Sequence, residues 1–159
     1  MCFLLYAGTI RPIPRRAWRK DAPDLCVASL SDRDAPVKTH FTTPEVQCIG
    51  STSGCGCDFP HAMLQNGAWP ELEFVEHVEE NPEQAATHSY HREALVELLR
   101  ASEEHVIELY GIWDGDFATP PQARETIAAE EILAPTFLFK ERGFYKVTVK
   151  PTAESTAPD

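Results

Sequence analysis

The sequence Asn81-Pro82-Glu83-Gln84 is a strong start signal for a long helix, and it constrains the fold more than any other feature. Asparagine can cap the first turn, proline suits the first helical position, and the glutamine side chain stands three residues after the cap. The helical pattern continues to about Glu104. Leu95, Leu98 and Leu99 share one stripe of this helix, so we expect it to pack against a sheet.

Most of the remaining chain has the pattern of strands. The ranges with alternating or continuous apolar residues are 2–8, 25–30, 45–50, 106–113 and a closing hairpin at 136–149 around Gly143. Thr119-Pro120-Pro121-Gln122 repeats the start signal and predicts a shorter helix to about Leu133. The range 70–79 fits a strand or a helix equally well. The sequence therefore predicts an α+β fold with a mainly antiparallel sheet of about five or six strands, covered by one long and one shorter helix.

Length and composition favour one domain of ordinary size. The chain has 159 residues, 43% of them hydrophobic, so residues 1–150 can bury a core without disulfides, whereas 151–159 has the composition of a disordered tail. Five cysteines is an odd number, and no basic region precedes the short apolar run from Cys2 to Ala7. This pattern predicts a reduced, cytoplasmic protein. No run is long enough to cross a membrane.

The charge distribution argues against nucleic acid as a partner. The formal net charge of −11 repels a phosphate backbone. A basic cluster nevertheless lies near the N-terminus, and it could bind an anionic ligand or an acidic partner protein, as in a non-catalytic interaction domain. The favoured interpretation is a solvated loop that neutralises the acidic segment between Glu71 and Glu83, since charge runs are usually solvated faces. The cluster consists of Arg11, Arg15, Arg16, Arg19 and Lys20.

The segment from Gly50 to Asp58 combines backbone freedom with soft nucleophilic side chains. On a regular strand, the Cα atoms of Cys55 and Cys57 would lie about 6.5 to 7 Å apart, at the upper limit for a disulfide. The glycines at 54 and 56 allow positive φ angles, so the chain can curl and bring the two sulfurs together. A tetrahedral zinc ion needs sulfurs only about 3.8 Å apart. The Gly-Cys-Gly-Cys order therefore favours metal binding, with zinc as the leading candidate.

Two thiolates make half of a zinc shell, and histidines are the candidates for the rest. His61 is close in sequence, and His88 and His91 lie on the apolar stripe of the long helix, three residues apart. We expect one or more of His61, His88 and His91 to complete a shell with Cys55 and Cys57. Each histidine could instead sit at the edge of the core and bond a backbone carbonyl.

Two alternatives involve catalysis. The same cysteine pair could perform thiol redox chemistry, although Asp58 would tend to raise a neighbouring thiol pKa. Separately, Met1-Cys2 followed by Phe3-Leu4-Leu5-Tyr6-Ala7-Gly8 resembles the start of N-terminal nucleophile amidotransferase-like hydrolases. That resemblance covers about eight residues and has Phe3 where a basic residue is common. It implies amide hydrolysis with Cys2 as nucleophile after removal of Met1.

Overall fold

Six strands form one sheet in the order β2-β3-β1-β5-β8-β6. A computed structural model describes residues 2–70 and 81–150. Neighbouring strands are antiparallel except β6 and β8, which are parallel. This arrangement confirms the predicted α+β fold with a mainly antiparallel sheet. The strands are β1 (Phe3–Thr9), β2 (Cys26–Ser29), β3 (Glu45–Gly50), β5 (Val106–Trp113), β6 (Ala123–Ala128) and β8 (Gly143–Thr148).

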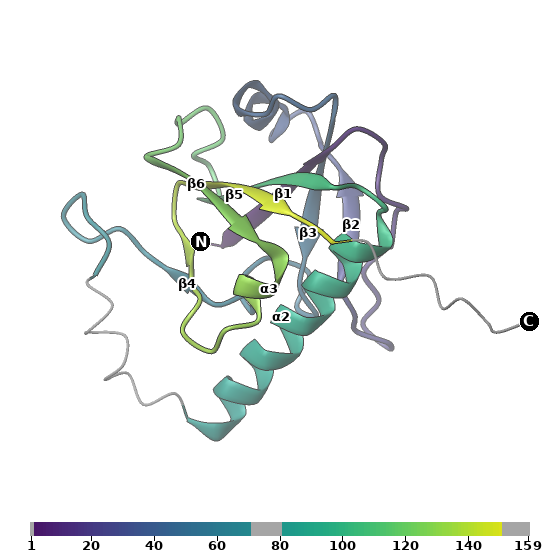
Figure 1. The fold of residues 1–159 in the computed structure, drawn as a ribbon, viewed down its shortest axis with the longest axis vertical. Coiled ribbons are helices and arrows are strands. Elements are labelled where there is room, and N and C mark those ends of the chain that lie inside the picture. Colours follow the sequence, from purple (N-terminus) through teal and green to yellow (C-terminus); the bar gives the residue numbers. More distant parts are fainter. Residues whose placement is uncertain (1, 71–80, 151–159) are drawn as a thin grey trace, which may run out of the picture.

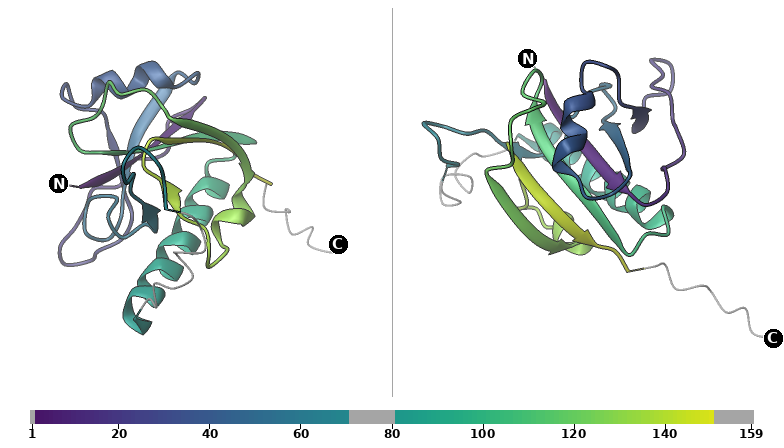
Figure 2. Two further views of the ribbon diagram at one scale, coloured as in Figure 1. Left: turned by 90° about the vertical axis from the view of Figure 1, so that its left-hand side faces the viewer. Right: turned by 90° about the horizontal axis from the view of Figure 1, so that it is seen from above.

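Helices cover the sheet on both faces. Figure 1 shows α2 (Pro82–Ala101) below the sheet and the 3-10 helix η1 (Ala35–His40) above it, and the turned view of Figure 2 agrees. The side chains of β1 alternate accordingly. Phe3 and Leu5 pack in the same core as Leu95 of α2, whereas Tyr6 packs with Val37 of η1. A strand covered on both sides is buried along its length, as the near-continuous apolar sequence of β1 requires.

The start of α2 is confirmed in detail. Asn81 Oδ1 accepts a hydrogen bond from the backbone N–H of Gln84 at 2.7 Å, and Pro82 occupies the first turn. The helix ends at Ala101, about three residues before the predicted end. Glu103 adopts a positive φ of 60°, which is incompatible with a continuing helix. Ser102 Oγ bonds the carbonyl of Leu99 and satisfies one of the last helical acceptors.

The predicted helix from about 119 to 133 is wrong over most of its length. Residues Ala123–Ala128 form β6, and only α3 (Ala129–Ile132) is helical. The backbone N–H of Gln122 donates to the carbonyl of Arg142 at 2.8 Å, which aligns the following residues beside β8. Pairing along a whole strand outweighs a local start signal, because helix propensity is a weak preference.

Strands are present within 136–149 as predicted, but they do not pair with each other, so the predicted closing hairpin is wrong. Its first half is β7 (Phe139–Lys140), which pairs in parallel with β4 (His61–Ala62) in a separate two-stranded sheet. The second half is β8, which lies between β5 and β6. Arg142 between them has a φ of 60°, and its N–H donates to the carbonyl of Gly111 at 2.7 Å. The chain therefore changes sheets at this corner.

Several predictions fall outside the described residues. These are the undecided segment at 70–79 from residue 71 onward, the acidic cluster before residue 81, and the tail from 151. Among the helices that the structure describes, none combines the length and the apolar character needed to cross a bilayer.

Candidate metal centre

Three thiols meet at one end of the sheet. The Sγ atoms of Cys2, Cys55 and Cys57 all lie within 4.8 Å of one another. Over residues 2–70 and 81–150, no other group of three or more histidine, cysteine, aspartate and glutamate side chains meets that criterion. All three thiols are partly buried. Such a group could hold a metal ion.

The register of the sheet explains why Cys2 joins the pair. β1 and β3 are antiparallel, with Leu5 opposite Ile49, so the start of β1 lies beside the end of β3. Cys2 precedes β1 directly, and the segment that carries Cys55 and Cys57 follows β3 directly. Sequence reasoning considered Cys2 only as a nucleophile. The antiparallel pairing of 2–8 with 45–50 was the signal that would have identified it as a third sulfur.

The cysteine turn, residues 50–58, depends on Gly54 for its direction. Gly54 has a φ of +87°, and its N–H donates to the carbonyl of Ser51 at 2.9 Å. Trp18 covers this glycine and donates its indole N–H to the carbonyl of Thr52 at 2.8 Å. The backbone N–H of Cys57 lies 3.4 Å from Cys55 Sγ. The predicted curl at Gly54 is therefore present.

Gly56 serves a different purpose from the predicted one, because it is not among the residues with positive φ. Its N–H donates to the carbonyl of Phe3 at 2.8 Å. A Cβ atom here would lie 2.8 Å from Phe3 O and 3.2 Å from the backbone nitrogen of Leu5. The missing side chain lets the turn lie directly on β1, and this contact holds Cys55 and Cys57 near Cys2.

The carboxylate of Asp58 stabilises the cysteine turn through hydrogen bonds within it. Asp58 Oδ2 accepts hydrogen bonds from Ser51 Oγ at 2.8 Å and from the backbone N–H of Ser53 at 3.2 Å. Burial alone would raise the pKa of Asp58, but these hydrogen bonds keep it below the usual value. Burial would raise the pKa of Cys55, but hydrogen bonds involving Ser53 and Cys57 lower it, and that Asp58 raises the pKa of a neighbouring thiol stays a prediction.

His91 connects the turn to α2 and is only 2% exposed. Its Nδ1 lies 2.7 Å from the carbonyl of Thr87, which can only accept, so Nδ1 carries a proton. Nε2 then faces the turn, 3.1 Å from Thr52 Oγ1 and 3.9 Å from Asp58 Oδ2. The predicted inward orientation of His91 is present. The ring packs the turn against the helix and does not belong to the three-thiol group.

His61 and His88 also lie outside the three-thiol group. The ring of His61 stacks on Phe3 at a centroid distance of 4.3 Å, and its Nδ1 lies 2.7 Å from the carbonyl of Phe59. Burial lowers the pKa of His61. His88 lies on the first turns of α2, where it lines a pocket together with Cys57. That a histidine completes a shell with Cys55 and Cys57 therefore stays a prediction.

The thiols differ in how readily they ionise. Burial alone would raise the pKa of Cys55, but hydrogen bonds involving Ser53 and Cys57 lower it below the ordinary value. Burial raises the pKa of Cys57 to about 12, and the hydrogen bond to Cys55 acts in the same direction. Cys48 packs beside the core around Tyr6, and burial raises its pKa to about 12 as well. Cys55 is thus more easily deprotonated than Cys57 or Cys48.

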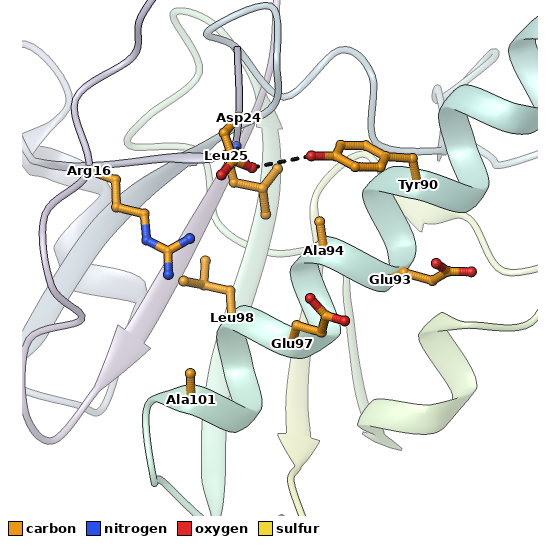
Figure 3. A pocket seen from close by; sticks show the side chains of 9 residues that line it. All are labelled: Arg16, Asp24, Leu25, Tyr90, Glu93, Ala94, Glu97, Leu98 and Ala101. Atoms are coloured by element: carbon orange, nitrogen blue, oxygen red, sulfur yellow. Dashed lines mark hydrogen bonds between the residues drawn. The ribbon is translucent and has the colours of Figure 1, made fainter. Parts of the chain in front are cut away.

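Two pockets lie beside α2. The first, of about 330 Å³, adjoins the cysteine turn and is lined by Cys57, Asp58, Asn81, Glu83, Gln84, Thr87 and His88. The second, of about 450 Å³, lies between α2 and the chain before β2 (Figure 3). Figure 3 shows Tyr90 of α2 bonding Asp24, with Arg16 and Glu97 on opposite sides of an apolar floor.

The basic cluster is partly used within the chain. Arg11 lies 3.9 Å from Glu103, and Arg19 lies 2.6 Å from Asp21. Both pairs are exposed, so they add little stability. The acidic segment that the cluster was predicted to neutralise lies largely outside the described residues, and the prediction of an acidic partner protein stays a prediction.

Comparisons of this chain with protein-family models, with curated proteins and with solved structures each returned no match.

Proposed function

We propose that this protein binds a thiophilic metal ion through Cys2, Cys55 and Cys57, and that the ion is zinc. The observation that carries the proposal is the convergence of three sulfurs within 4.8 Å from two separate segments of the chain. Tetrahedral zinc, with Zn–S bonds of about 2.3 Å, needs sulfurs about 3.8 Å apart, so only small adjustments separate the group from a bound state. Thiolate ligands favour zinc, monovalent copper or iron–sulfur clusters over hard cations.

The surroundings of the group support metal binding as well. A metal ligand must be a thiolate, and the lowered pKa of Cys55 supplies one at little cost. Gly56 and Asp58 fix the turn through backbone and side-chain hydrogen bonds, so the sulfurs need little reorganisation on binding. Removing hydrogen bonds that hold metal ligands in place typically lowers metal affinity about 10- to 100-fold.

Metal analysis tests the proposal. Protein purified without a histidine tag should contain about one equivalent of zinc per chain, and cobalt titration should give the intense absorption of thiolate-bound Co(II). Cys2→Ser, Cys55→Ser and Cys57→Ser should each weaken binding by about 100-fold or more. Cys48→Ser is the matched control, because Cys48 packs on the other side of the sheet, and it should bind normally. Wild-type protein that takes up neither ion would refute the proposal.

Thiol redox chemistry is the second candidate, and the lowered pKa of Cys55 beside two further thiols favours it. The Cys55 thiolate would attack a substrate disulfide and release one of its sulfurs as a thiolate, leaving a mixed disulfide. Cys2 or Cys57 would then lose its proton, attack Cys55 Sγ and release the second substrate thiolate. The substrate disulfide is thereby reduced and the protein pair oxidised.

Alkylation distinguishes the two functions. If a metal occupies the site, iodoacetamide should modify Cys55 slowly until a chelator is added, because coordinated thiolates are protected. If the site is a redox centre, alkylation below neutral pH should be fast with or without chelator. Peptide mass spectrometry identifies which thiol reacts.

A further inference from the structure

Among the described residues, no fourth histidine, cysteine, aspartate or glutamate ligand atom lies within 4.8 Å of all three sulfurs, so the fourth ligand of a tetrahedral ion is either the predicted histidine or a molecule from outside the chain. Closed structural zinc sites have four protein ligands, whereas sites with three keep a position for water or an exogenous ligand. The following inference rests on the proposed metal binding. We infer that the fourth ligand is the sulfur of a small cationic thiol, held in the pocket beside Cys57.

The position of the pocket supports this inference. Cys57 belongs both to the three-thiol group and to the lining of the pocket of about 330 Å³. This volume lies at the lower end of the range found for small-molecule sites. The other lining residues come from Asp58 and from the beginning of α2, and almost all of them are polar. A small polar molecule therefore fits the pocket better than an apolar one.

The metal ligands themselves favour sulfur in the fourth position. Three thiolates around a dication leave one net negative charge and an electron-rich ion, which polarises a bound water poorly. A soft ion with soft ligands prefers a further soft ligand. When a thiol replaces the water, its S–H bond breaks, a metal–sulfur bond forms and the proton passes to solvent. No oxidant or reductant is involved, and the exogenous thiol becomes a thiolate at neutral pH.

The charges around the pocket favour a cation. Asp58 and Glu83 contribute two carboxylates, and the lining contains no lysine or arginine. The beginning of α2 has the opposite effect, but its dipole is equivalent to only about half a positive charge. Asn81 already accepts from the N–H of Gln84, which satisfies one of the free donors there. Two carboxylates and an anionic metal centre outweigh that half charge.

Cobalt-substituted full-length protein provides the test, with thiols of equal chain length and opposite charge. Cysteamine should raise the sulfur-to-cobalt absorption by about one third, as the number of thiolates goes from three to four. It should bind about 10-fold more tightly than 3-mercaptopropionate, and the ratio should fall with added salt. Glu83→Gln should bring the ratio toward one. Glu93→Gln is the matched control, because Glu93 lies on the same helix but lines the other pocket.

The outcomes separate the two proposals. If cobalt does not bind, metal binding itself is refuted, and the inference falls with it. If cobalt binds with three thiolates but neither thiol adds a fourth, the inference alone is overturned. A cobalt spectrum that shows four protein ligands before any thiol is added also overturns it. Equal binding of the two thiols, or tighter binding of 3-mercaptopropionate, contradicts the assigned charge preference and overturns it too.

Discussion

Replacement of Gly56 by alanine should separate the three thiols without touching any of them. The new Cβ would lie 2.8 Å from the carbonyl oxygen of Phe3 and 3.2 Å from the backbone nitrogen of Leu5. Contacts below 3.0 Å essentially never occur for a real Cβ. Both neighbours belong to β1, which pairs with strands on either side, so β1 cannot move away cheaply. The cysteine turn must therefore move away from β1.

The cost can be worked out from these contacts. Moving the turn breaks the hydrogen bond from Gly56 N–H to Phe3 O, which contributes about 1 kcal/mol. Overpacking at a tight contact adds about 1 to 3 kcal/mol. We expect Gly56→Ala to lower the free energy of unfolding of the metal-free protein by about 2 to 4 kcal/mol. Metal affinity should fall about 10- to 100-fold, because Cys55 and Cys57 move away from Cys2.

Urea unfolding and cobalt titration measure the two effects, and two further alanine variants provide controls. Gly54→Ala introduces strain at a φ of +87° in the same turn, with its nearest new contact at an ordinary 3.5 Å from Trp18. Gly67→Ala introduces similar strain at +81°, outside the cysteine turn, with nothing within 4 Å of the new Cβ. Each should cost about 1 kcal/mol in stability. The reasoning is refuted if Gly56→Ala is no less stable than Gly67→Ala and binds cobalt as tightly as wild type.

Three further predictions concern the thiols, the turn and the core. In metal-free protein, alkylation of Cys55 should rise with pH through a midpoint below that of an ordinary cysteine, whereas Cys57, with a pKa of about 12, should stay unreactive until strongly alkaline pH; peptide mass spectrometry measures both. Asp58→Asn should destabilise the protein by about 1 to 2 kcal/mol at neutral pH. Because the pKa of Asp58 is lowered on folding, its contribution is present above about pH 4 and should disappear as pH falls further, which urea unfolding of both proteins at a series of pH values would detect. Arg92→Leu should cost about 2 to 4 kcal/mol, since it removes the donor to two backbone carbonyls near residue 136; thermal unfolding measures the loss, and an unchanged melting temperature would contradict it.

The elements that could be predicted from sequence are those fixed by local chemistry. The Asn81 cap and the start of α2 need only their own residues and a nearby apolar surface, and the near-continuous apolar sequence of β1 indicates a buried strand whatever its partners. β6 was missed and β7 was given the wrong partner, because their pairing depends on distant strands. Pro120 and Pro121 suggest a helix start, yet they also allow an extended chain, and pairing with β8 decides between the two. Local sequence signals therefore fail to predict strands whose pairing with distant strands decides their conformation.

In the candidate site, too, the features set by neighbouring residues could be predicted and those set by distant strand pairing could not. Proximity of Cys55 and Cys57 follows from the single residue between them and from the positive φ at Gly54, so sequence could indicate it. Cys2 is more than fifty positions away, and only the register between β1 and β3 brings it near. The helical stripe correctly placed His91 inward, but periodicity gives a direction and no distance. The Nε2 of His91 contacts Thr52 of the cysteine turn and is not part of the three-thiol group.

The unequal ionisation of the thiols makes metal binding by the group depend on pH. Three thiolates within 4.8 Å of one another would repel strongly, because like charges at this distance disfavour each other's ionised form. Because the pKa of Cys55 is lowered and that of Cys57 is raised to about 12, Cys55 ionises before Cys57, and Cys57 keeps its proton at neutral pH. A metal ion must displace the proton from Cys57, so affinity rises with pH. The proton on Cys57 therefore opposes metal binding in acid.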